Sequence, residues 1–319
     1  MSEMAKDIAG RSEAMRPTRS KSVFFLSGWR KWGVYYLFLA PFMTLFLVFT
    51  IIPVLAAGFL SFTYFNMLES PKFIGIENYR LLFVEDDIFL TSVKNTLTFA
   101  FVTGPVGFLL SFTFAWLIHQ MRYKAIYSLA IYAPSLTSAV VIGVFFRDNF
   151  FSGDKYGILN HLLLSAGVLD EPFIWLQNVR TVLPVIIGVT LWTSMNTGFL
   201  IWLAGFNNVP EELYEAGRID GVQSRFQEVW YITLPYMKPQ ILLNSVLATV
   251  AALGVFSITF ELAGLPSPLY AAHTIVAHLF DYAFIRFEMG YASAIAVVLF
   301  MISFGLSQMF FRVFGSDDT

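Results

Sequence analysis

Six long blocks without a charged residue dominate the sequence. They cover residues 34–62, 95–118, 125–146, 181–206, 239–260 and 289–311. A helix that crosses the hydrocarbon core of a bilayer needs about 20 consecutive apolar residues, and each block is longer than that. The pattern therefore predicts an all-α integral membrane protein with six transmembrane helices and both termini on one side of the bilayer.

The polar segment 207–238 carries helix signals of its own. Pro210 and Glu211 favour a helix start, because proline suits the first position and acidic side chains complement the helix N-terminus. Gly221 suits a helix end, since glycine adopts the left-handed backbone conformation without strain. Apolar and aromatic residues then recur at helical spacing until Pro235, which is expected to interrupt the pattern. The segment is therefore predicted to form two short helices joined at Gly221.

The distribution of basic residues predicts the orientation. Of the 20 Lys and Arg residues, 13 lie in the tail 1–33, the loop 119–124, the segment 207–238 and the C-terminal end, and seven lie in the opposite loops. Basic residues are enriched in cytoplasmic loops, so both termini and segment 207–238 are expected in the cytoplasm. A cleaved signal peptide is the competing interpretation of the N-terminus, but the block that follows is too long for its apolar region.

The loops on the other side are longer than simple turns. An amphipathic helix is predicted at 156–168, and a short apolar helix at 272–285. The second helix is too short to cross a bilayer, so it is expected to lie at the interface or to re-enter the membrane. The expected organisation is an N-terminal tail, a six-span domain and a C-terminal tail, at 1–33, 34–312 and 313–319.

Composition excludes several classes of protein. The chain is 57% hydrophobic and 13% charged, with a mean hydropathy of +0.66, whereas soluble domains carry about 25% charged residues. The chain is therefore expected in a lipid bilayer. Its net charge of −2 gives no indication of nucleic-acid binding. The absence of cysteine excludes disulfides, thiolate metal sites and cysteine nucleophiles.

Motifs for catalysis or cofactor binding are missing from the sequence. No G-x-x-x-x-G-K-[ST] phosphate loop occurs, so this chain is not expected to bind ATP itself. His273 and His278 are five residues apart, which is not the spacing of paired zinc ligands on a helix. We therefore predict no catalytic residue, no metal site and no cofactor.

Three short motifs within segment 207–238 resemble the EAA loop of ABC-importer permeases. They are Glu215-Ala216-Gly217, Asp220-Gly221 and Ile232-Thr233-Leu234-Pro235. The chain departs from the family pattern in having Gly217 in place of alanine and one extra residue between Gly221 and Ile232. The resemblance implies a cytoplasmic coupling helix that docks on a separate ATPase subunit. It assigns this coupling to Glu212, Glu215, Ala216, Gly217, Asp220, Gly221, Leu234 and Pro235.

Two weaker elements resemble the carbohydrate-uptake branch of that family. Residues 73–79 are similar to its F-x-G-x-x-N-Y element, and residues 290–294 are similar to the start of its last span. The resemblance implies the type I ABC-importer permease fold in a bacterial cell membrane, and transport of a sugar or oligosaccharide through one half of a translocation pathway. It also implies partners: a second permease subunit, two ATP-binding cassette subunits that bind the ATP, and an extracellular solute-binding protein.

Four polar or aromatic residues within or beside the blocks are candidates for lining the solute pathway. They are Trp192, Asn196, Asn244 and Glu261. Sugar sites combine aromatic faces with amide and carboxylate hydrogen bonds, and an ionisable group at membrane depth usually faces a polar cavity. The alternatives are hydrogen bonds between helices for the asparagines and a position just outside the membrane for Glu261.

Other functions are less compatible with these patterns. An ABC permease for an amino acid or a peptide would share the EAA-like loop but not the sugar-type elements. A secondary transporter would carry intramembrane carboxylates or interrupted helices for ion coupling, and charged residues are nearly absent from the blocks. A membrane enzyme would show clustered His, Asp or Glu at an interface. The sequence does not identify the solute.

Overall fold

The computed structural model describes residues 22–193 and 197–315, and it divides the chain into two units, 1–56 and 57–319. The first unit holds α2 (Ser22–Phe46), a π-helical turn η1 (Leu47–Ile51) and most of α3 (Ile52–Leu60). In the π turn, the N–H of Ile52 bonds to the carbonyl of Leu47. Proline at position 53 has no N–H to continue an α-helical ladder, which accounts for the irregularity just before it.

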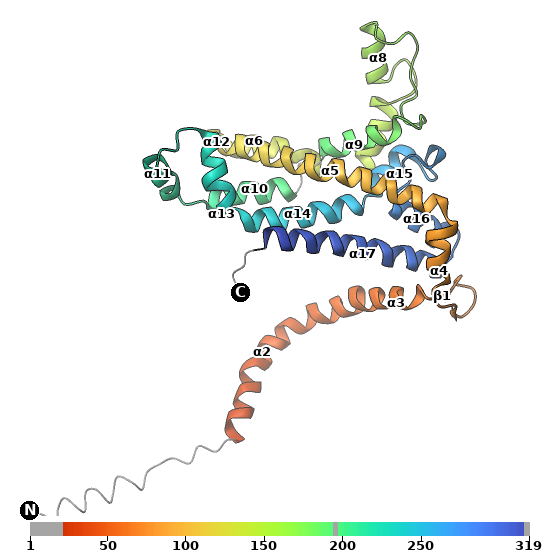
Figure 1. The fold of residues 1–319 in the computed structure, drawn as a ribbon, viewed down its shortest axis with the longest axis horizontal. Helices are drawn as coiled ribbons and strands as arrows, with labels where there is room; N and C mark the ends of the chain where they lie inside the picture. Colours follow the sequence, from red (N-terminus) through yellow and green to blue (C-terminus); the bar gives the residue numbers. More distant parts are fainter. Residues whose placement is uncertain (1–21, 194–196, 316–319) are drawn as a thin grey trace, which may run out of the picture. The chain divides into compact units, whose positions relative to one another are not determined.

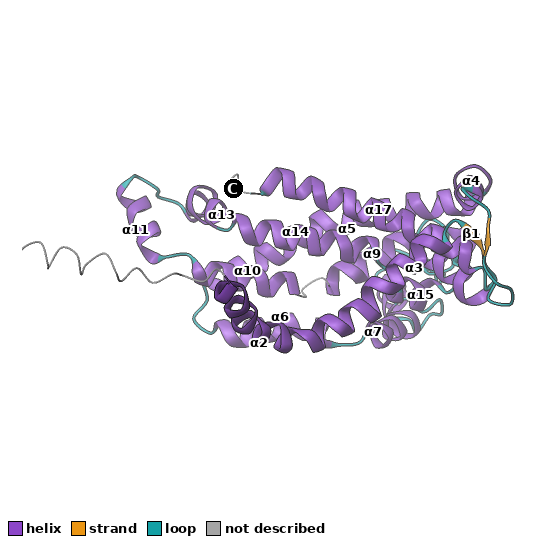
Figure 2. Ribbon diagram, turned by 90° about the horizontal axis from the view of Figure 1, so that it is seen from below, coloured by secondary structure: helices purple, strands orange, loops and turns teal. Residues whose placement is uncertain are grey.

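The second unit is built on long apolar helices that lie side by side (Figures 1 and 2). Helix α5 packs against α10 and α14, and α14 also packs against α17. Five helices in the described chain are long and apolar enough to cross a membrane, or six if one bent pair counts as a single span. The predicted all-α membrane fold is confirmed. The principal helices are α5 (Asp87–His119), α6 (Lys124–Tyr132), α7 (Ala139–Phe145), α9 (Val182–Thr193), α10 (Thr197–Asn208), α14 (Lys238–Leu253), α15 (Ser257–Ala263) and α17 (Met289–Phe314).

The third apolar block is not one straight helix. Residues Lys124–Leu136 and Ala139–Phe150 form two helices that meet at 85°. Between them, Thr137 and Ser138 have extended backbones with ψ of 138° and 136°. The bend follows a 3-10 turn, η3 (Ala133–Leu136), that contains Pro134, and a proline inside a helix removes one backbone donor and crowds the preceding turn.

The fifth block is interrupted as well. Helix α14 ends at Leu253, and α15 begins at Ser257. At Phe256 the backbone leaves the helical region, with φ −142° and ψ −61°. We call residues 254–256 the span-5 break. Gly254 and the β-branched Val255 are weaker helix formers than the residues before them, which favours a break at this place.

Several short elements connect the long helices. In Figure 1, α4, β1 and α16 lie towards one end of the bundle, and α8 projects away from it beyond α9. Asn160, fully buried, organises the loop 152–175 by donating to the carbonyls of Ser152, Asp154 and Phe173 and accepting from Trp175 Nε1. The predicted helix at 156–168 is shorter in the structure, Ile158–Ser165. The short elements of the second unit are β1 (Thr63–Tyr64), β2 (Lys72–Phe73), α4 (Glu77–Arg80), η2 (Leu81–Glu85), η4 (Phe146–Phe150), α8 (Ile158–Ser165), η6 (Pro268–Tyr270), α16 (Ile275–Phe280) and η7 (Asp281–Ile285).

The first turn of α17 packs tightly on the β1 segment through Gly290. Its N–H donates to the carbonyl of Phe65, and a Cβ at this position would overlap the carbonyl oxygen of Thr63. Backbone atoms cannot move aside as the end of a flexible side chain can. Gly305, in the same helix, has no atom within 4 Å of the point that a Cβ would occupy, so it offers a matched control.

We therefore expect Gly290→Ala to destabilise the fold by about 1–3 kcal/mol, the usual cost of overpacking. Gly305→Ala should leave stability nearly unchanged. The measurement is the thermal unfolding midpoint of the purified protein in detergent. Equal midpoints for the two variants would show that α17 does not need this close contact.

Candidate functional site

The segment between α10 and α14 folds as two short helical pieces around a glycine turn. The first is α11 (Glu211–Ile219), with Pro210 as its N-cap residue and two acidic residues in its first turn. Asp220 caps its C-terminus, and Gly221 follows with φ +93°. That backbone conformation is strained for a residue with a Cβ, so glycine is favoured where the chain turns.

Helix α11 is held against the second piece by three contacts. A Cβ on Gly217 would lie 2.6 Å from Ile232 Cδ1, so the absence of a side chain at Gly217 lets the two helices approach. The Tyr214 hydroxyl lies 3.0 Å from Thr233 Oγ1. Arg218 lies 3.7 Å from the carboxylate of Glu228. Gly217, the departure from the EAA pattern, therefore has a packing role here.

The second piece is continuous through the position where an interruption was expected. It comprises α12 (Arg225–Glu228), the π turn η5 (Val229–Thr233) and α13 (Leu234–Tyr236). Ser224 and Gln227 form a reciprocal capping box at its start. Leu234 and Pro235 are helical, and the backbone leaves the helical conformation only at Met237, with φ −90° and ψ 15°. The expected interruption at Pro235 is therefore wrong; the proline is accommodated directly after the π turn η5.

The outward surface of α11 is rich in exposed residues. Glu212, Glu215, Ala216 and Asp220 are exposed, and the Ile219 side chain is 86% exposed. Ile219 and the neighbouring carboxylates are therefore accessible to another protein, to which Ile219 could contribute apolar burial and the carboxylates could contribute orientation.

A separate cavity of about 350 Å³ lies among α5, α9, α10 and α14. The described residues that line it include no charged side chain, and its polar groups come from Thr and Ser hydroxyls and the amide of Asn244. The Asn244 amide donates to the carbonyl of Gly198 at 3.5 Å, which joins α14 to α10. The lining residues are Phe99, Thr103, Gly104, Gly107, Phe108, Ser111, Thr190, Thr193, Gly198, Asn244, Leu247, Ala248, Ala251, Ala252 and Val255.

Of the four candidate pathway residues, Asn244 alone is placed at this cavity by the described part of the chain. Asn196 lies outside the described residues. Trp192 is 54% exposed, and its ring meets the ring of Phe146 edge-on at 5.4 Å. Glu261 packs directly on Gly143, and its carboxylate lies 3.9 Å from Arg147. Trp192 and Glu261 thus both contact the helical segment 139–150, and neither lines the cavity.

Comparison with known proteins identifies the family. Residues 123–314 match the family described as "Binding-protein-dependent transport system inner membrane component". The chain belongs to this family. It is 35% identical to the probable ABC transporter permease protein YesP of Bacillus subtilis (strain 168), over 91% of each chain. It is 32% identical to the arabinooligosaccharides transport system permease protein AraP of the same organism, over 91% of this chain and 93% of AraP.

The fold of this permease also matches a solved structure. The crystal structure of a bacterial alginate ABC transporter, in complex with an alginate pentasaccharide-bound periplasmic protein, contains a chain that superposes with a TM-score of 0.76. The match covers 90% of this permease and 95% of that chain, at 21% identity. It establishes the ABC-importer permease fold.

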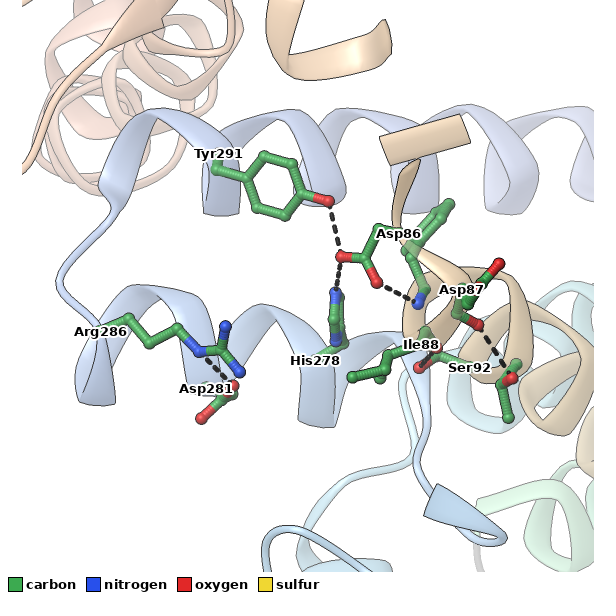
Figure 3. A network of polar contacts seen from close by, with 10 residues as sticks. Asp86, Asp87, Ile88, Ser92, His278, Asp281, Arg286 and Tyr291 are labelled. Atoms are coloured by element: carbon green, nitrogen blue, oxygen red, sulfur yellow. Dashed lines mark hydrogen bonds and ion pairs between the residues drawn. The ribbon is translucent and has the colours of Figure 1, made fainter. Parts of the chain in front are cut away.

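A buried polar cluster that no sequence motif indicated lies at the N-terminus of α5 (Figure 3). We call Asp86, His278 and Tyr291 the Asp86 cluster. The Asp86 carboxylate caps α5 by accepting from the Phe89 N–H at 2.8 Å. It also accepts from the Tyr291 hydroxyl at 2.7 Å and lies 3.0 Å from His278 Nε2. Three segments of the permease therefore meet at one carboxylate.

Burial and hydrogen bonding act in opposite directions on Asp86. Burial alone would raise the pKa of Asp86, but hydrogen bonds from His278, Tyr291 and the Phe89 N–H together hold that pKa well below its usual range. The carboxylate is therefore ionised at neutral pH. The Asp86-Asp87 pair just before an apolar run was a readable helix-start signal. Nothing in the sequence indicated its partners His278 and Tyr291, which lie 192 and 205 positions away.

His273 packs beside this cluster as a neutral, buried side chain. It is 2% exposed, and neither ring nitrogen has a hydrogen-bond partner among the described residues. Burial, assisted by repulsion from His278, lowers the pKa of His273 from 6.5 to about 4, and the opposing attraction of Asp281 and Asp86 is smaller. The unfolded chain therefore binds a proton at mildly acidic pH that the folded permease does not bind.

This difference in proton binding predicts that the folded permease is less stable at acidic pH. The free energy of unfolding should fall as pH decreases from 6.5 towards 4, by about 1–2 kcal/mol at pH 5. His273→Leu removes the titrating group and should flatten the dependence of the unfolding midpoint between pH 7.5 and pH 5. His161→Gln, at an exposed histidine, should keep the parental slope. An unchanged slope in His273→Leu would assign the acid sensitivity to other groups.

Proposed function

We propose that this chain is the transmembrane permease subunit of an ATP-driven importer that takes up a sugar or oligosaccharide. The observation that carries the proposal is the geometry of α11. It is fixed to the following helix through Gly217 and Tyr214, while Glu212, Glu215 and Ile219 remain exposed. A short helix held in this way can receive a displacement from a docked partner and pass it to α14, which lines the cavity.

ATP is bound and hydrolysed by partner subunits. The sequence contains no G-x-x-x-x-G-K-[ST] phosphate loop, which supports ATP binding by a separate subunit. In the proposed complex, two ATP-binding cassette subunits supply hydrolysis, and one of them docks on α11. A second, homologous permease supplies the other half of the pathway, and an extracellular solute-binding protein delivers the solute.

The carbohydrate assignment rests on chemistry and on relatives. The cavity offers hydroxyl and amide groups and, among its described lining residues, no charge. Such groups suit hydrogen bonding to the hydroxyls of a sugar. AraP is named for arabinooligosaccharides, and the alginate transporter was solved with a binding protein that holds an alginate pentasaccharide. Both solutes are carbohydrates, which supports the same class for this permease.

The coupling role of α11 is tested by two substitutions. Gly221→Val strains the turn at φ +93° by about 1–2 kcal/mol and should misplace α11. Glu215→Ala removes an exposed charge from the docking surface, and loss of one charged partner at an interface can cost about 2–5 kcal/mol. Both variants should insert normally, yet lose solute uptake and solute-stimulated ATP hydrolysis together in the reconstituted complex.

Gly167→Val is the matched control for Gly221→Val. Gly167 has φ +69° and open space around it, like Gly221, but it follows α8 instead of α11. The Gly167→Val variant should retain solute uptake. Co-purification of the ATPase subunit reports assembly. If Gly221→Val and Glu215→Ala both assemble and transport like the parent, segment 207–238 is not the coupling element.

Both termini and segment 207–238 are proposed to lie in the cytoplasm, from the 13-to-7 distribution of basic residues. Because the chain has no cysteine, single cysteines can report the side of the membrane. In intact cells, an impermeant thiol reagent should label Glu171→Cys, in the loop after α8, and should not label Ser224→Cys. Both positions are exposed. The reverse labelling pattern would invert the topology.

A further inference from the structure

Helix α16 and the π turn η7, residues Ile275–Ile285, form an apolar helix too short to cross a membrane. This helix is wedged between other elements of the second unit and contacts α5, α17 and the span-5 break. Two groups of its contacts, one on α5 and one on the break, together link Asp86 to the wall of the cavity.

The first group ties α16 and the loop before it to α5. His278 reaches the Asp86 carboxylate at 3.0 Å. Further along α5, Thr96 Oγ1 accepts from the N–H of Ile275 at 2.9 Å. Asn95 donates to the carbonyls of Tyr270 and His273 at 2.8 and 3.0 Å. The N-terminal half of α5 thus holds the segment 270–278 through side-chain hydrogen bonds.

The second group ties α16 to the span-5 break. Thr274, the N-cap residue of α16, donates from Oγ1 to the carbonyl of Val255 at 3.1 Å. The ring of Phe280 stacks on Phe256, with centroids 4.9 Å apart and planes at 30°. Val255 lines the cavity. The helix α16 and its N-cap residue therefore contact both Asp86 and Val255, a residue of the cavity wall.

We propose that Asp86 is a positioning residue for the cavity wall. Through His278 it fixes α16, and α16 in turn fixes the span-5 break and Val255. This inference rests on the proposed function in one respect, since the cavity is taken as part of the solute pathway. It assigns to Asp86 an effect on solute affinity, in addition to its local role as the N-cap of α5.

The physical basis is the cost of releasing a largely buried carboxylate, whose side chain is 12% exposed. Asp86 accepts from three donors, and a hydrogen bond to an ionised group is stronger than one between neutral groups. Removing the carboxylate frees His278 and Tyr291 together and leaves α16 with its weaker neutral contacts. The carbonyl of Val255 lies between α14 and α15 and accepts a buried hydrogen bond from Thr274, so a movement of α16 reaches the break directly.

The test measures hydrogen–deuterium exchange in the complete transporter complex in lipid nanodiscs. Asp86→Ala removes all three hydrogen bonds, and Asp86→Asn retains an acceptor for the Phe89 N–H while weakening the contact with His278 and Tyr291. Both should raise amide exchange at 254–258 and at 275–280, by about tenfold for Asp86→Ala. Asp281→Asn is the matched control. It breaks the ion pair with Arg286 on the same segment and should leave exchange at 254–258 unchanged (Figure 3).

Rescue by a conservative variant separates positioning from simple loss of packing. His278→Gln keeps an N–H donor near the Nε2 position, so amide exchange at 254–258 and 275–280 should match the parent. His278→Leu fills the space without a donor, so exchange at both places should rise as in Asp86→Ala. In uptake assays, Asp86→Asn and His278→Leu should raise the solute concentration for half-maximal uptake about threefold to tenfold with little change in maximal rate.

Two outcomes would overturn the proposal. If exchange rises at 275–280 but not at 254–258, Asp86 holds α16 without positioning the break. If exchange rises at both places while the half-maximal solute concentration stays at the parental value, the break does not shape the solute site. If Asp86→Ala fails to assemble, the same exchange and uptake measurements are compared among Asp86→Asn, His278→Leu and His278→Gln. The exchange measurement does not depend on transport, so failure of the carbohydrate-import proposal would appear separately, as absent uptake in the parent complex.

Discussion

In the hydrocarbon core of a bilayer, a backbone N–H or C=O group exposed by a break in a helix needs a partner from the surrounding protein or from a water-filled cavity. This constraint explains the most irregular part of the permease. The carbonyl of Val255 lies in the span-5 break, and Thr274 at the start of the short helix α16 donates to it. Helix α16 is in turn fixed to α5 by Thr96 and the Asp86 cluster. The interruption of one span and the wedged helix beside it are therefore parts of one arrangement.

The regular part of this fold could be predicted from the sequence, and the interruptions could not. Blocks free of charge predicted the all-α membrane fold, because length and apolar composition are all that a crossing helix requires. The 85° bend near Thr137 and the break at Phe256 lie inside such blocks, where hydropathy is uniform. Proline at position 134 hinted at the first irregularity. Gly254 and Val255, as weak helix formers, favour the second, but the contacts with α16 that hold it are brought together only in the folded chain.

The same contrast holds for the candidate site. Gly221 could be identified as a turn residue from its type alone, and the structure gives it a positive φ. Gly217 stood out in the sequence only as a departure from a motif, whereas its role is to admit Ile232 at close range. Asp86 and His278 are 192 positions apart in the chain, so no local pattern could pair them. Asn244 was the one candidate pathway residue found at the cavity among the described residues, since hydropathy cannot distinguish a residue that faces a cavity from one that faces a neighbouring helix.

Energy coupling is the central claim, and ATP-dependent uptake tests it most directly. The permease would be reconstituted in proteoliposomes with the proposed second permease and ATPase subunits, with ATP on the side of segment 207–238 and solute-loaded binding protein on the other. The account predicts that solute accumulates only with hydrolysable ATP and not with a non-hydrolysable analogue or an ion gradient alone. Accumulation driven by an ion gradient in the absence of ATP would contradict it.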